Sequence, residues 1–431
     1  MYLSALLIGV YEKQAGHTMG QIIVLGAGIV GVSTSIWLQR AGYRVTLVDR
    51  VGPASGTSFG NAGVLAAGGV IPVTTPGLWK KAPFMLLDKN SPLFLRWRYL
   101  PKLMPFLFTY LKKCTEEDVN IYAKGMLPLI YDSVEQHKLL AKGTPAEAFI
   151  KEADYCFGYD TETRYLGEKS SWALRKQLGF EFQVESGEDY AKTDPLYAGK
   201  FHTVVRCKKH GMVTDPGAYV KALAHHFEES GGEIVLADVM GLGQEDTGKP
   251  FLDSSSGKMS ADKLVLTAGV WSRPFMEKMG IKVPMESERG YHIELKTPER
   301  YPVNPMMVAS GKFAVTPMKG RIRCAGVVEF GGTKAGPEDG PIKMLHTHIE
   351  ALFGDLKYDE IEEWLGHRPA ITDSLPMLGQ VSSDREIYTA FGHQHLGLTG
   401  GAKSGKILSD IITQKPTNLD LSPYRPDRFS A

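Results

Sequence analysis

Apolar residues fill positions 21–25, a glycine turn follows, and a second apolar run at 45–49 ends on Asp49. This pattern predicts a buried strand, a turn, a helix and a second strand. Gly26, Gly28 and Gly31 have the spacing of the dinucleotide-binding fingerprint: they permit a tight turn, close approach to a pyrophosphate and close helix packing. Asp49 lies 18 residues beyond Gly31, near the ~20 residues expected for a ribose-binding acid. A glycine turn in another α/β protein is the alternative.

Similar alternation of helix and strand returns later in the chain. Pro216 to Glu229 reads as a helix, with Asp215 as its N-cap and Pro216 in the first helical position. We expect strands at 233–236, 263–269 and 387–390, and a final helix at 404–412 that begins near Lys403. No second GxGxxG follows a strand, so nothing in the sequence indicates a nicotinamide site.

The segments between these elements show a different pattern of predicted helices and strands. Four prolines between 78 and 113 predict short, kinked helices, and 116–143 is again helical. A strand is expected at 155–159, and alternating apolar residues predict antiparallel strands from 283 to about 330. Segments 346–353 and 359–365 look helical.

Segments that alternate between strand and helix are separated by segments that do not. This arrangement predicts an α/β plus α+β protein whose Rossmann-like domain is discontinuous in the sequence. We assign 19–75, 206–284 and 360–420 to this cofactor-binding domain. We assign 76–205 and 285–359 to an inserted domain of antiparallel sheet and helices that binds substrate. Residues 1–18 precede Met19, a natural place for a chain to begin, and we expect them to lie outside the fold.

Bulk properties narrow the function. The chain has 431 residues, enough for two or three domains, and a net charge of only +1. Such a balance gives no general attraction to nucleic acid. The four cysteines are widely spaced and form no CxxC pair, so we expect neither a metal site nor a disulfide framework, and a cytoplasmic location fits best.

Three further segments carry a resemblance to a known family: Thr57–Gly63, Thr267–Ser272 and Gly392–Thr399. A fourth, Arg368-Pro369 followed by Asp373 and Pro376–Gly379, matches an RP…D…PxxG signature. Their order makes nearly the whole chain similar to the D-amino-acid oxidase superfamily of FAD enzymes, in its bacterial D-amino-acid dehydrogenase and hydroxy-D-proline dehydrogenase branch. The resemblance implies FAD as the cofactor.

The resemblance also implies where FAD binds. Taken without it, the Ser/Gly/Asn stretch at 57–63 is more commonly an ordinary solvated turn, and the glycine turn at 269 reads equally well as an ordinary strand-to-helix turn. The expected cofactor-binding residues are Gly26, Gly28, Ile29, Val30, Gly31, Asp49, Arg50, Thr57, Ser58, Asn61, Ala62, Gly63, Val239, Ala268, Gly269, Trp271, His393, His395, Leu396, Gly397, Leu398 and Thr399. No cysteine lies in these segments, so we expect noncovalent binding.

Oxidation of an amine beside a carboxylate needs mainly orientation, because the flavin carries the electron chemistry. An arginine suits the carboxylate. Arg368 is the first candidate, since the arginine of the matching RP motif has this role in the resembled oxidases, and Arg289 is the second. Tyr291 is a candidate cap over the substrate; on an alternating strand it shares a face with Arg289, while His292 points away.

His395, in the last loop, is a candidate contact of substrate or flavin, and Phe313 reads as a core residue or a pocket wall. Lys403 is a candidate for strengthening the positive end of the last helix, with a solvent-facing lysine as the alternative.

The segment 78–113 is basic and aromatic, with eight Lys or Arg against one Asp. Such a mixture suits a lipid interface, and the resembled dehydrogenases pass electrons to quinone, so we expect peripheral attachment to the membrane through this segment. A helical substrate domain with solvated charges is the alternative.

The function expected from the resemblance is FAD-dependent oxidation of D-amino acids to 2-oxo acids and ammonia, by hydride transfer to flavin N5. The electrons then pass to a quinone or another acceptor that is not oxygen. Three alternatives stay open: a D-proline or cis-4-hydroxy-D-proline dehydrogenase, an amine oxidase that uses oxygen, and a flavin-retaining subunit of a larger complex without catalysis.

Overall fold

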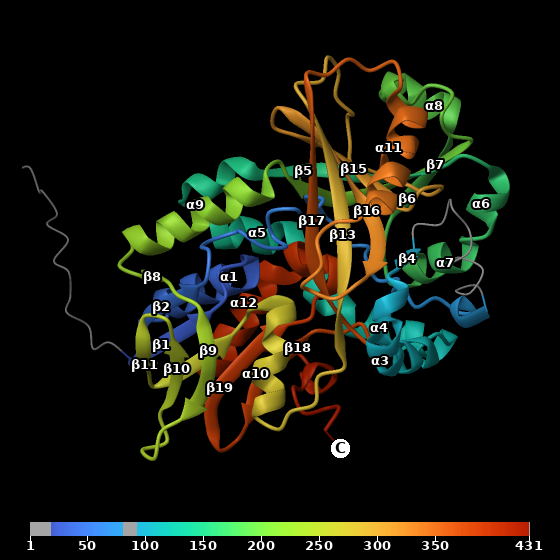
Figure 1. Ribbon diagram of the computed structural model, residues 1–431. Coiled ribbons are helices and arrows are strands. Elements are labelled where there is room, and N and C mark those ends of the chain that lie inside the picture. Colours follow the sequence, from blue (N-terminus) through green and yellow to red (C-terminus); the bar gives the residue numbers. More distant parts are fainter. Residues whose placement is uncertain (1–18, 81–92, 431) are drawn as a thin grey trace, which may run out of the picture.

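The computed structural model describes residues 19–80 and 93–430 of the chain. Residues 1–18, which were expected to lie outside the fold, fall outside these ranges, as do the central residues of the basic segment. Two sheets stand side by side, with helices on the first sheet and around the second (Figure 1). A parallel α/β layer joined to a largely antiparallel sheet confirms the predicted fold class.

The first sheet has six strands in the order β18-β19-β12-β1-β2-β8. All neighbours pair in parallel except β18, which is antiparallel to β19. Its strands come from three separate stretches of the chain. They are β1 (Gln21–Leu25), β2 (Arg44–Asp49), β8 (Glu233–Leu236), β12 (Lys263–Leu266), β18 (Met377–Ser382) and β19 (Arg385–Phe391).

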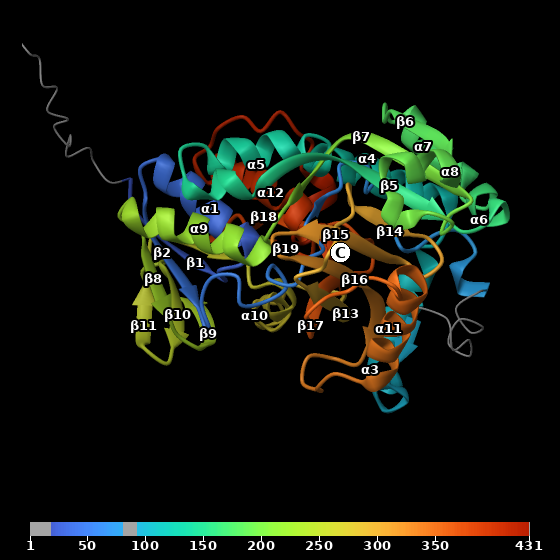
Figure 2. The same ribbon diagram turned by 90° about the horizontal axis from the view of Figure 1, so that it is seen from above.

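Both faces of this sheet are buried, as a parallel sheet requires. Ile22 and Val24 face a core under the helices, whereas Ile23 and Leu25 face a second core. In Figure 2 the helices lie on one side of the sheet and a small antiparallel sheet lies on the other. The helices are α1 (Ile29–Arg40), α5 (Ser133–Ala141), α9 (Pro216–Glu229) and α12 (Gly397–Ile412), and the small sheet is β9 (Val239–Gln244), β10 (Pro250–Ser254) and β11 (Gly257–Ser260).

The second sheet has the order β17-β13-β16-β15-β14-β5-β7-β3, and β4 and β6 pair at its sides. The antiparallel strands predicted between 283 and 330 are present. Strands β7 and β17 also belong here, although they fall largely in stretches that we assigned to the cofactor-binding domain. The strands are β3 (Val64–Leu65), β4 (Leu93–Leu95), β5 (Ile150–Tyr159), β6 (Phe182–Ser186), β7 (Thr203–Val213), β13 (Met285–Lys296), β14 (Met306–Val308), β15 (Phe313–Met318), β16 (Arg321–Phe330) and β17 (Glu360–Ile371).

The two faces of the second sheet have different environments. Helix α11 (Asp339–Phe353) contacts β13 and β16 on one face, and Tyr291, Cys324 and Phe313 belong to the core there. Phe313 is therefore a core residue. The other face lines a cavity. Side chains alternate between these faces with a period of two, so the register of each strand decides which residues reach the cavity.

Two sequence-based expectations were wrong. Residues 359–365 form the start of strand β17, which pairs with β13 along its whole length. Ile361 and Leu365 pack against the core under α11, while Glu362 pairs with Lys296, so tertiary pairing overrides the helical preference of the glutamates. The last helix starts at Gly397, earlier than predicted, because its glycines pack against α1.

Of the remaining helices, Ser272–Lys278 packs against the core of the first sheet, Glu116–Ile130 contacts α12, and the others lie near the second sheet. In the basic segment the prediction of short helices is confirmed where the structure describes it: a 3₁₀ turn at Trp97–Tyr99 precedes α3, which contains Pro105. Within the described parts of the chain, no helix is long and apolar enough to cross a membrane. These helices are α3 (Leu100–Lys112), α4 (Glu116–Ile130), α6 (Glu162–Leu166), α7 (Lys169–Gln177), α8 (Gly187–Thr193) and α10 (Ser272–Lys278).

Candidate functional site

The predicted cofactor residues gather at one edge of the six-stranded sheet. Strands β1, β2, β8, β12 and β19 run parallel, so their carboxyl ends meet at this edge. The loops that follow them hold the glycine turn, Asp49, Val239, the 267–271 turn and the 392–397 loop. Ligands bind at this edge in open α/β sheets.

The glycine turn has the form that a pyrophosphate needs. A Cβ on Gly31 would lie 1.8 Å from the carbonyl oxygen of Gly26, so only glycine permits this packing of helix against turn. Gly28 is the N-cap of α1 and has no side chain to cap the helix, and the first turn carries no acidic residue. Ser58 Oγ accepts a hydrogen bond from the Ile29 N–H (3.0 Å), and the N–H groups directly after it in the first turn have no partner within the helix.

Asp49 is held by backbone groups on both of its oxygens. Oδ2 accepts from the Ala27 N–H (2.9 Å), and Oδ1 accepts from Val51 (2.9 Å) and Gly52 (3.0 Å). Each carboxylate oxygen has about two lone-pair sites, so Oδ2 keeps capacity for a ribose hydroxyl. Beside it, the Arg50 guanidinium lies 4.1 Å from the ring centroid of Trp271.

The loop 57–63 connects the two sheets. Asn61 Oδ1 accepts from the Gly63 N–H (2.9 Å), and Thr57 Oγ1 donates to the His367 carbonyl (2.9 Å). The buried Arg323 of β16 donates to the carbonyl oxygens of Phe59 and Asn61. The loop is thus fixed from both sides, and Thr57, Asn61 and Ala62 line the cavity.

The other two loops complete the edge. Gly269 follows Ala268 with a φ of +57°, a conformation that favours glycine. In the last loop, His393 Nε2 lies 2.8 Å from Ser404 Oγ, and Thr399 Oγ1 accepts from the Ala66 N–H (3.3 Å). His393 therefore supports the loop from behind, whereas Leu396 and Thr399 line the cavity.

Lys403 does not lie at the start of a helix. Since α12 begins at Gly397, Lys403 belongs to its second turn, and its Nζ pairs with Asp132 at 2.7 Å. The positive end of α12 is instead formed by Gly397 and Leu398, and this end of the helix has no side-chain cap.

These residues fit FAD. A helix start with no acidic residue, over a glycine cradle, suits the pyrophosphate, and a carboxylate at the end of β2 suits the ribose. The start of α12 has no side-chain cap, and it faces the part of the cavity that residues of the 57–66 segment also line. A dinucleotide that carries a ring system matches this combination.

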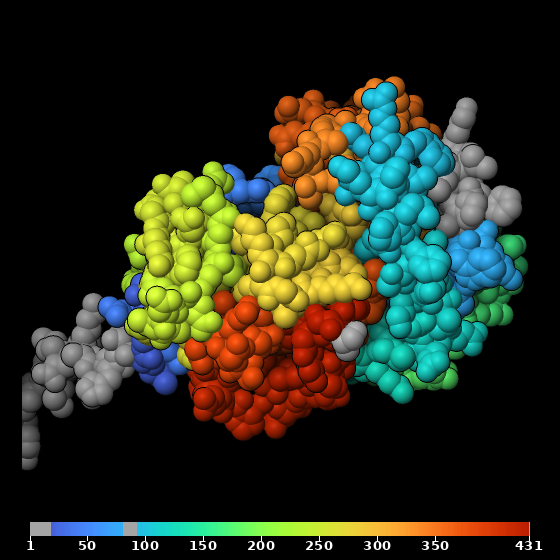
Figure 3. Space-filling view, turned by 60° about the horizontal axis from the view of Figure 1, so that its bottom comes forward, coloured from blue at the N-terminus to red at the C-terminus, as the bar shows by residue number. Residues whose placement is uncertain are grey.

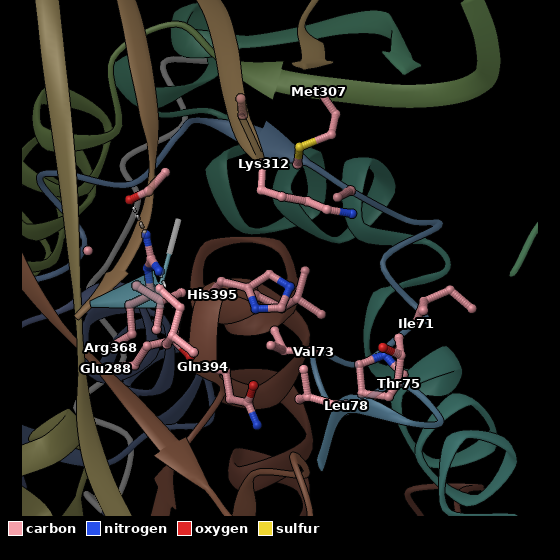
Figure 4. A pocket seen from close by; sticks show the side chains of 18 of the residues that line it. Ile71, Val73, Thr75, Leu78, Glu288, Met307, Lys312, Arg368, Gln394 and His395 are labelled. Carbon is pink, nitrogen blue, oxygen red and sulfur yellow. Dashed lines mark hydrogen bonds and ion pairs between the residues drawn. The ribbon is translucent and has the colours of Figure 1, made fainter. Parts of the chain in front are cut away.

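The cavity has a volume of about 1410 Å³. Ligand pockets commonly have ~300–1000 Å³, so there is room for a flavin ring together with a substrate. Figure 4 shows Glu288, Arg368, Gln394 and His395 at one end of the cavity, its polar end, with the apolar side chains of Val73 and Leu78 next to His395 and Ile71 farther away.

Arg368 of β17 lies at this polar end. Its Nη1 pairs with Glu288 Oε1 at 2.6 Å and donates to the Val327 carbonyl (3.1 Å), and its Nη2 donates to the Gly326 carbonyl (3.2 Å). Its side chain is 18% exposed. Val327 has a φ of +61°, which is rare for a β-branched residue. The unusual turn of β16 thus directs two carbonyls at the guanidinium.

Arg289 is not brought together with Arg368. It is fully buried, its Nε lies 3.1 Å from Glu329, and its Nη2 donates to the Gly336 carbonyl. Tyr291 shares that face, as predicted: its hydroxyl donates to Glu329 and accepts from the Glu338 N–H. Burial, with the bond to Glu329 second, raises the pKa of Tyr291 to about 12. Tyr291 is also among the residues that line the cavity.

His292 lies on the opposite side of β13, as predicted. Its ring stacks on Trp364 with centroids 5.0 Å apart, and its Nδ1 lies 3.1 Å from the Gly60 carbonyl. His395 faces the cavity and is exposed to it. Because the residue lies deep in the protein, desolvation lowers its pKa, which favours the neutral imidazole.

Glu288, Trp364 and Gly366 are among the cavity residues that sequence reasoning missed. Glu288 was identifiable from its position, since it precedes Arg289 and therefore faces the other side of an alternating strand. Trp364 and Gly366 were hidden by the helical interpretation of 359–365. As part of β17 they share a face with Arg368.

Comparisons with known proteins identify the family of the chain. The family model for FAD dependent oxidoreductases, DAO, matches residues 21–411. A D-amino-acid oxidase of Bradyrhizobium diazoefficiens is 34% identical over 415 residues, covering 95% of this chain and 98% of that protein. A D-amino acid dehydrogenase of the same organism is 28% identical over 420 residues, covering 95% and 99%.

Solved structures show the same fold. A glycine oxidase from Geobacillus kaustophilus superposes with a TM-score of 0.72 at 19% identity, covering 95% of this chain and 98% of that one. An L-proline dehydrogenase from P. horikoshii gives 0.70 at 18% identity, covering 95% and 97%. Because the family model matches most of the chain and a relative is 34% identical over nearly its whole length, the chain belongs to the DAO family of FAD-dependent oxidoreductases.

Proposed function

We propose that this enzyme oxidises D-amino acids to 2-oxo acids and ammonia and passes the electrons to an acceptor other than oxygen. The observation that carries the proposal is Arg368, a partly exposed guanidinium in a cavity that adjoins the FAD residues. Curated relatives that span nearly the whole chain are D-amino-acid oxidases and dehydrogenases by name.

Arg368 receives the substrate carboxylate in this proposal. A guanidinium offers several N–H donors in a planar fork, and two of its nitrogens are already fixed by the carbonyls of β16. The carboxylate is therefore met by a preorganised group, and the α-carbon is directed along the cavity. Bound FAD supplies the redox chemistry by accepting the hydride.

The neighbouring residues shape the reaction space. Trp364 and Gly366 give β17 a flat, apolar surface next to Arg368, and the neutral imidazole of His395 faces the same space. Arg289 has its charge balanced by Glu329 on the other side of the sheet. We therefore assign the carboxylate to Arg368 and give Arg289 and Tyr291 a supporting role in the Glu329 network.

The membrane part of the proposal is peripheral attachment at the inner face of the cytoplasmic membrane, with a quinone as acceptor. On α3, Met104 and Phe108 are 48% and 62% exposed, and Lys112 Nζ lies 4.1 Å from the Phe108 ring centroid. Trp97 is 62% exposed just before this helix. The segment lies on the surface, cyan in Figure 3, and such pairing of aromatic and basic side chains suits a lipid interface.

The test is product formation from paired enantiomers. Purified enzyme should convert D-amino acids, with an artificial dye as acceptor, to 2-oxo acid and ammonia, and L-enantiomers should give little. Arg368→Ala should retain FAD and lose most kcat/KM. Equal rates with both enantiomers, or near-normal activity of Arg368→Ala, would overturn the proposal.

The same assay separates the alternatives. A D-proline or hydroxy-D-proline enzyme would prefer ring amines, and an oxidase would form peroxide in step with product in the absence of dye. A protein that carries flavin without catalysis would remain yellow and form no product from any amine.

A further inference from the structure

Glu288 is a buried carboxylate at the polar end of the cavity. Its side chain is 2% exposed, Oε1 pairs with Arg368, and Oε2 has no hydrogen-bond partner. A buried carboxylate oxygen without a partner is costly. The surroundings of Glu288 therefore lack a hydrogen-bond donor for Oε2.

The charge balance indicates what this donor is. If a substrate carboxylate joined Arg368, two anions would share one guanidinium, which is unfavourable in a desolvated site. An α-amino acid solves this problem itself, because its ammonium is separated from its carboxylate by a single carbon. A carboxylate on Arg368 therefore brings a cation beside Glu288.

The groups around Glu288 leave this role open. Arg368 on β17 already occupies Oε1. Tyr110 on α3 is close enough for Glu288 to help raise its pKa, after burial, but its hydroxyl makes no hydrogen bond. Burial lowers the pKa of His395, which favours the neutral imidazole, and the charges of Glu288 and Arg368 shift this pKa in opposite directions. Figure 4 shows Glu288 and Arg368 adjacent and Lys312 farther along the cavity.

We propose that Glu288 recognises the substrate's α-ammonium through Oε2, so that the Arg368–Glu288 pair binds the amino acid as a zwitterion. This inference rests on the proposed function. It makes Glu288 the residue that selects amines over 2-hydroxy acids and simple carboxylic acids.

Two matched ligands test the inference without turnover. 2-Aminoisobutyrate lacks an α-hydrogen and is not oxidised, and isobutyrate is the same acid without the amino group. Each is titrated into FAD-loaded enzyme and followed by the flavin's visible spectrum. Wild type should bind 2-aminoisobutyrate more tightly. In Glu288→Gln its affinity should fall about 10- to 100-fold, the loss expected for a charged hydrogen bond, while isobutyrate binds as well or better.

The controls separate this inference from the proposed function. Glu168→Gln removes another cavity carboxylate, one that pairs with Lys312 at 3.0 Å, and should leave both affinities unchanged. Arg368→Ala should weaken both ligands; if neither ligand depends on Arg368, the proposed function fails.

If Glu288→Gln weakens both ligands equally, or neither, Glu288 only positions Arg368 and the inference is wrong. Glu288→Asp keeps the charge and should retain the preference for the amine; it replaces the Gln variant if that protein does not fold. A preference lost in a folded Asp variant with full FAD content would also contradict the inference.

Discussion

The carboxylate of Asp49 accepts a hydrogen bond from the backbone N–H of Ala27 at 2.9 Å. This contact joins the end of β2 to the glycine turn after β1. The acid and the pyrophosphate cradle are therefore one unit, and the spacing between them in the sequence has a structural cause.

Asp49→Ala should weaken FAD binding about 10- to 100-fold, because it removes the ribose acceptor and an anchor of the turn. Asp49→Asn, which keeps one acceptor oxygen, should lose less. Titration of apoprotein with FAD, followed by flavin fluorescence, measures both. Unchanged affinity in the Ala variant would mean that Asp49 does not contact the cofactor.

Helices α1 and α12 pack through glycine. A Cβ on Gly405 would lie 2.3 Å from Ser33 Oγ and 2.7 Å from the Thr34 nitrogen, whereas one on Gly400 would meet nothing closer than 3.6 Å. Gly405→Ala should destabilise the protein by about 1–3 kcal/mol. Gly400→Ala, on the same helix, should be neutral or stabilising by up to about 1 kcal/mol. Chemical denaturation compares the two, and equal effects would contradict this packing.

His137 gives the stability a pH dependence. Leu398 presents only a carbonyl to Nε2 (2.8 Å), so Nε2 carries the proton and Nδ1 accepts from the Tyr219 hydroxyl (2.7 Å). Burial lowers the pKa of His137 to about 4 from 6.5. As the pH falls, the unfolded chain therefore binds the proton before the folded protein does. The stability that neutral His137 contributes is complete above pH 6.5 and is lost as the pH falls toward 4.

His137→Gln keeps a donor and an acceptor but does not titrate. The stability advantage of wild type over this variant should shrink by about 1–1.5 kcal/mol between pH 7.5 and 5.5. Denaturation at both pH values measures the change. Parallel curves would show that His137 titrates normally in the folded protein.

The exposed aromatic residues beside α3 predict binding to lipid. The double variant Trp97→Ser, Phe108→Ser should reduce co-sedimentation with anionic vesicles at low salt several-fold. Val184→Ser alters an exposed apolar residue on β6 (45% exposed) and serves as the control. Wild-type enzyme that ignores anionic vesicles would remove the membrane part of the proposal.

Sequence reasoning succeeded where local chemistry decides structure. The turn at Gly26–Gly31 and the cap of α9 by Asp215, which accepts from the Ala218 N–H at 2.9 Å, follow from short-range rules. It failed where pairing between residues far apart in the sequence decides the structure. The helical preference of 359–365 yields to pairing with β13, and Gly401 concealed the start of α12 because it serves a close contact with Ile29, far away in the sequence.

The site divides in the same way. The expected cofactor residues lie in loops whose motifs, together with the family resemblance, made them accessible from the sequence. The partners of Arg289 and Arg368 were not, because both ion pairs cross strands: Glu329 on β16 takes one and Glu288 on β13 takes the other. Only the register of the sheet shows that the first pair is turned away from the cavity.

The most direct test of the account is anaerobic mixing of the purified, FAD-loaded enzyme with single amino acids while the visible flavin absorbance is recorded. The account predicts that D-amino acids, D-proline derivatives included, bleach the flavin and that their L-enantiomers leave it oxidised. A protein that binds no flavin, or a flavin that no D-amino acid bleaches, would contradict it.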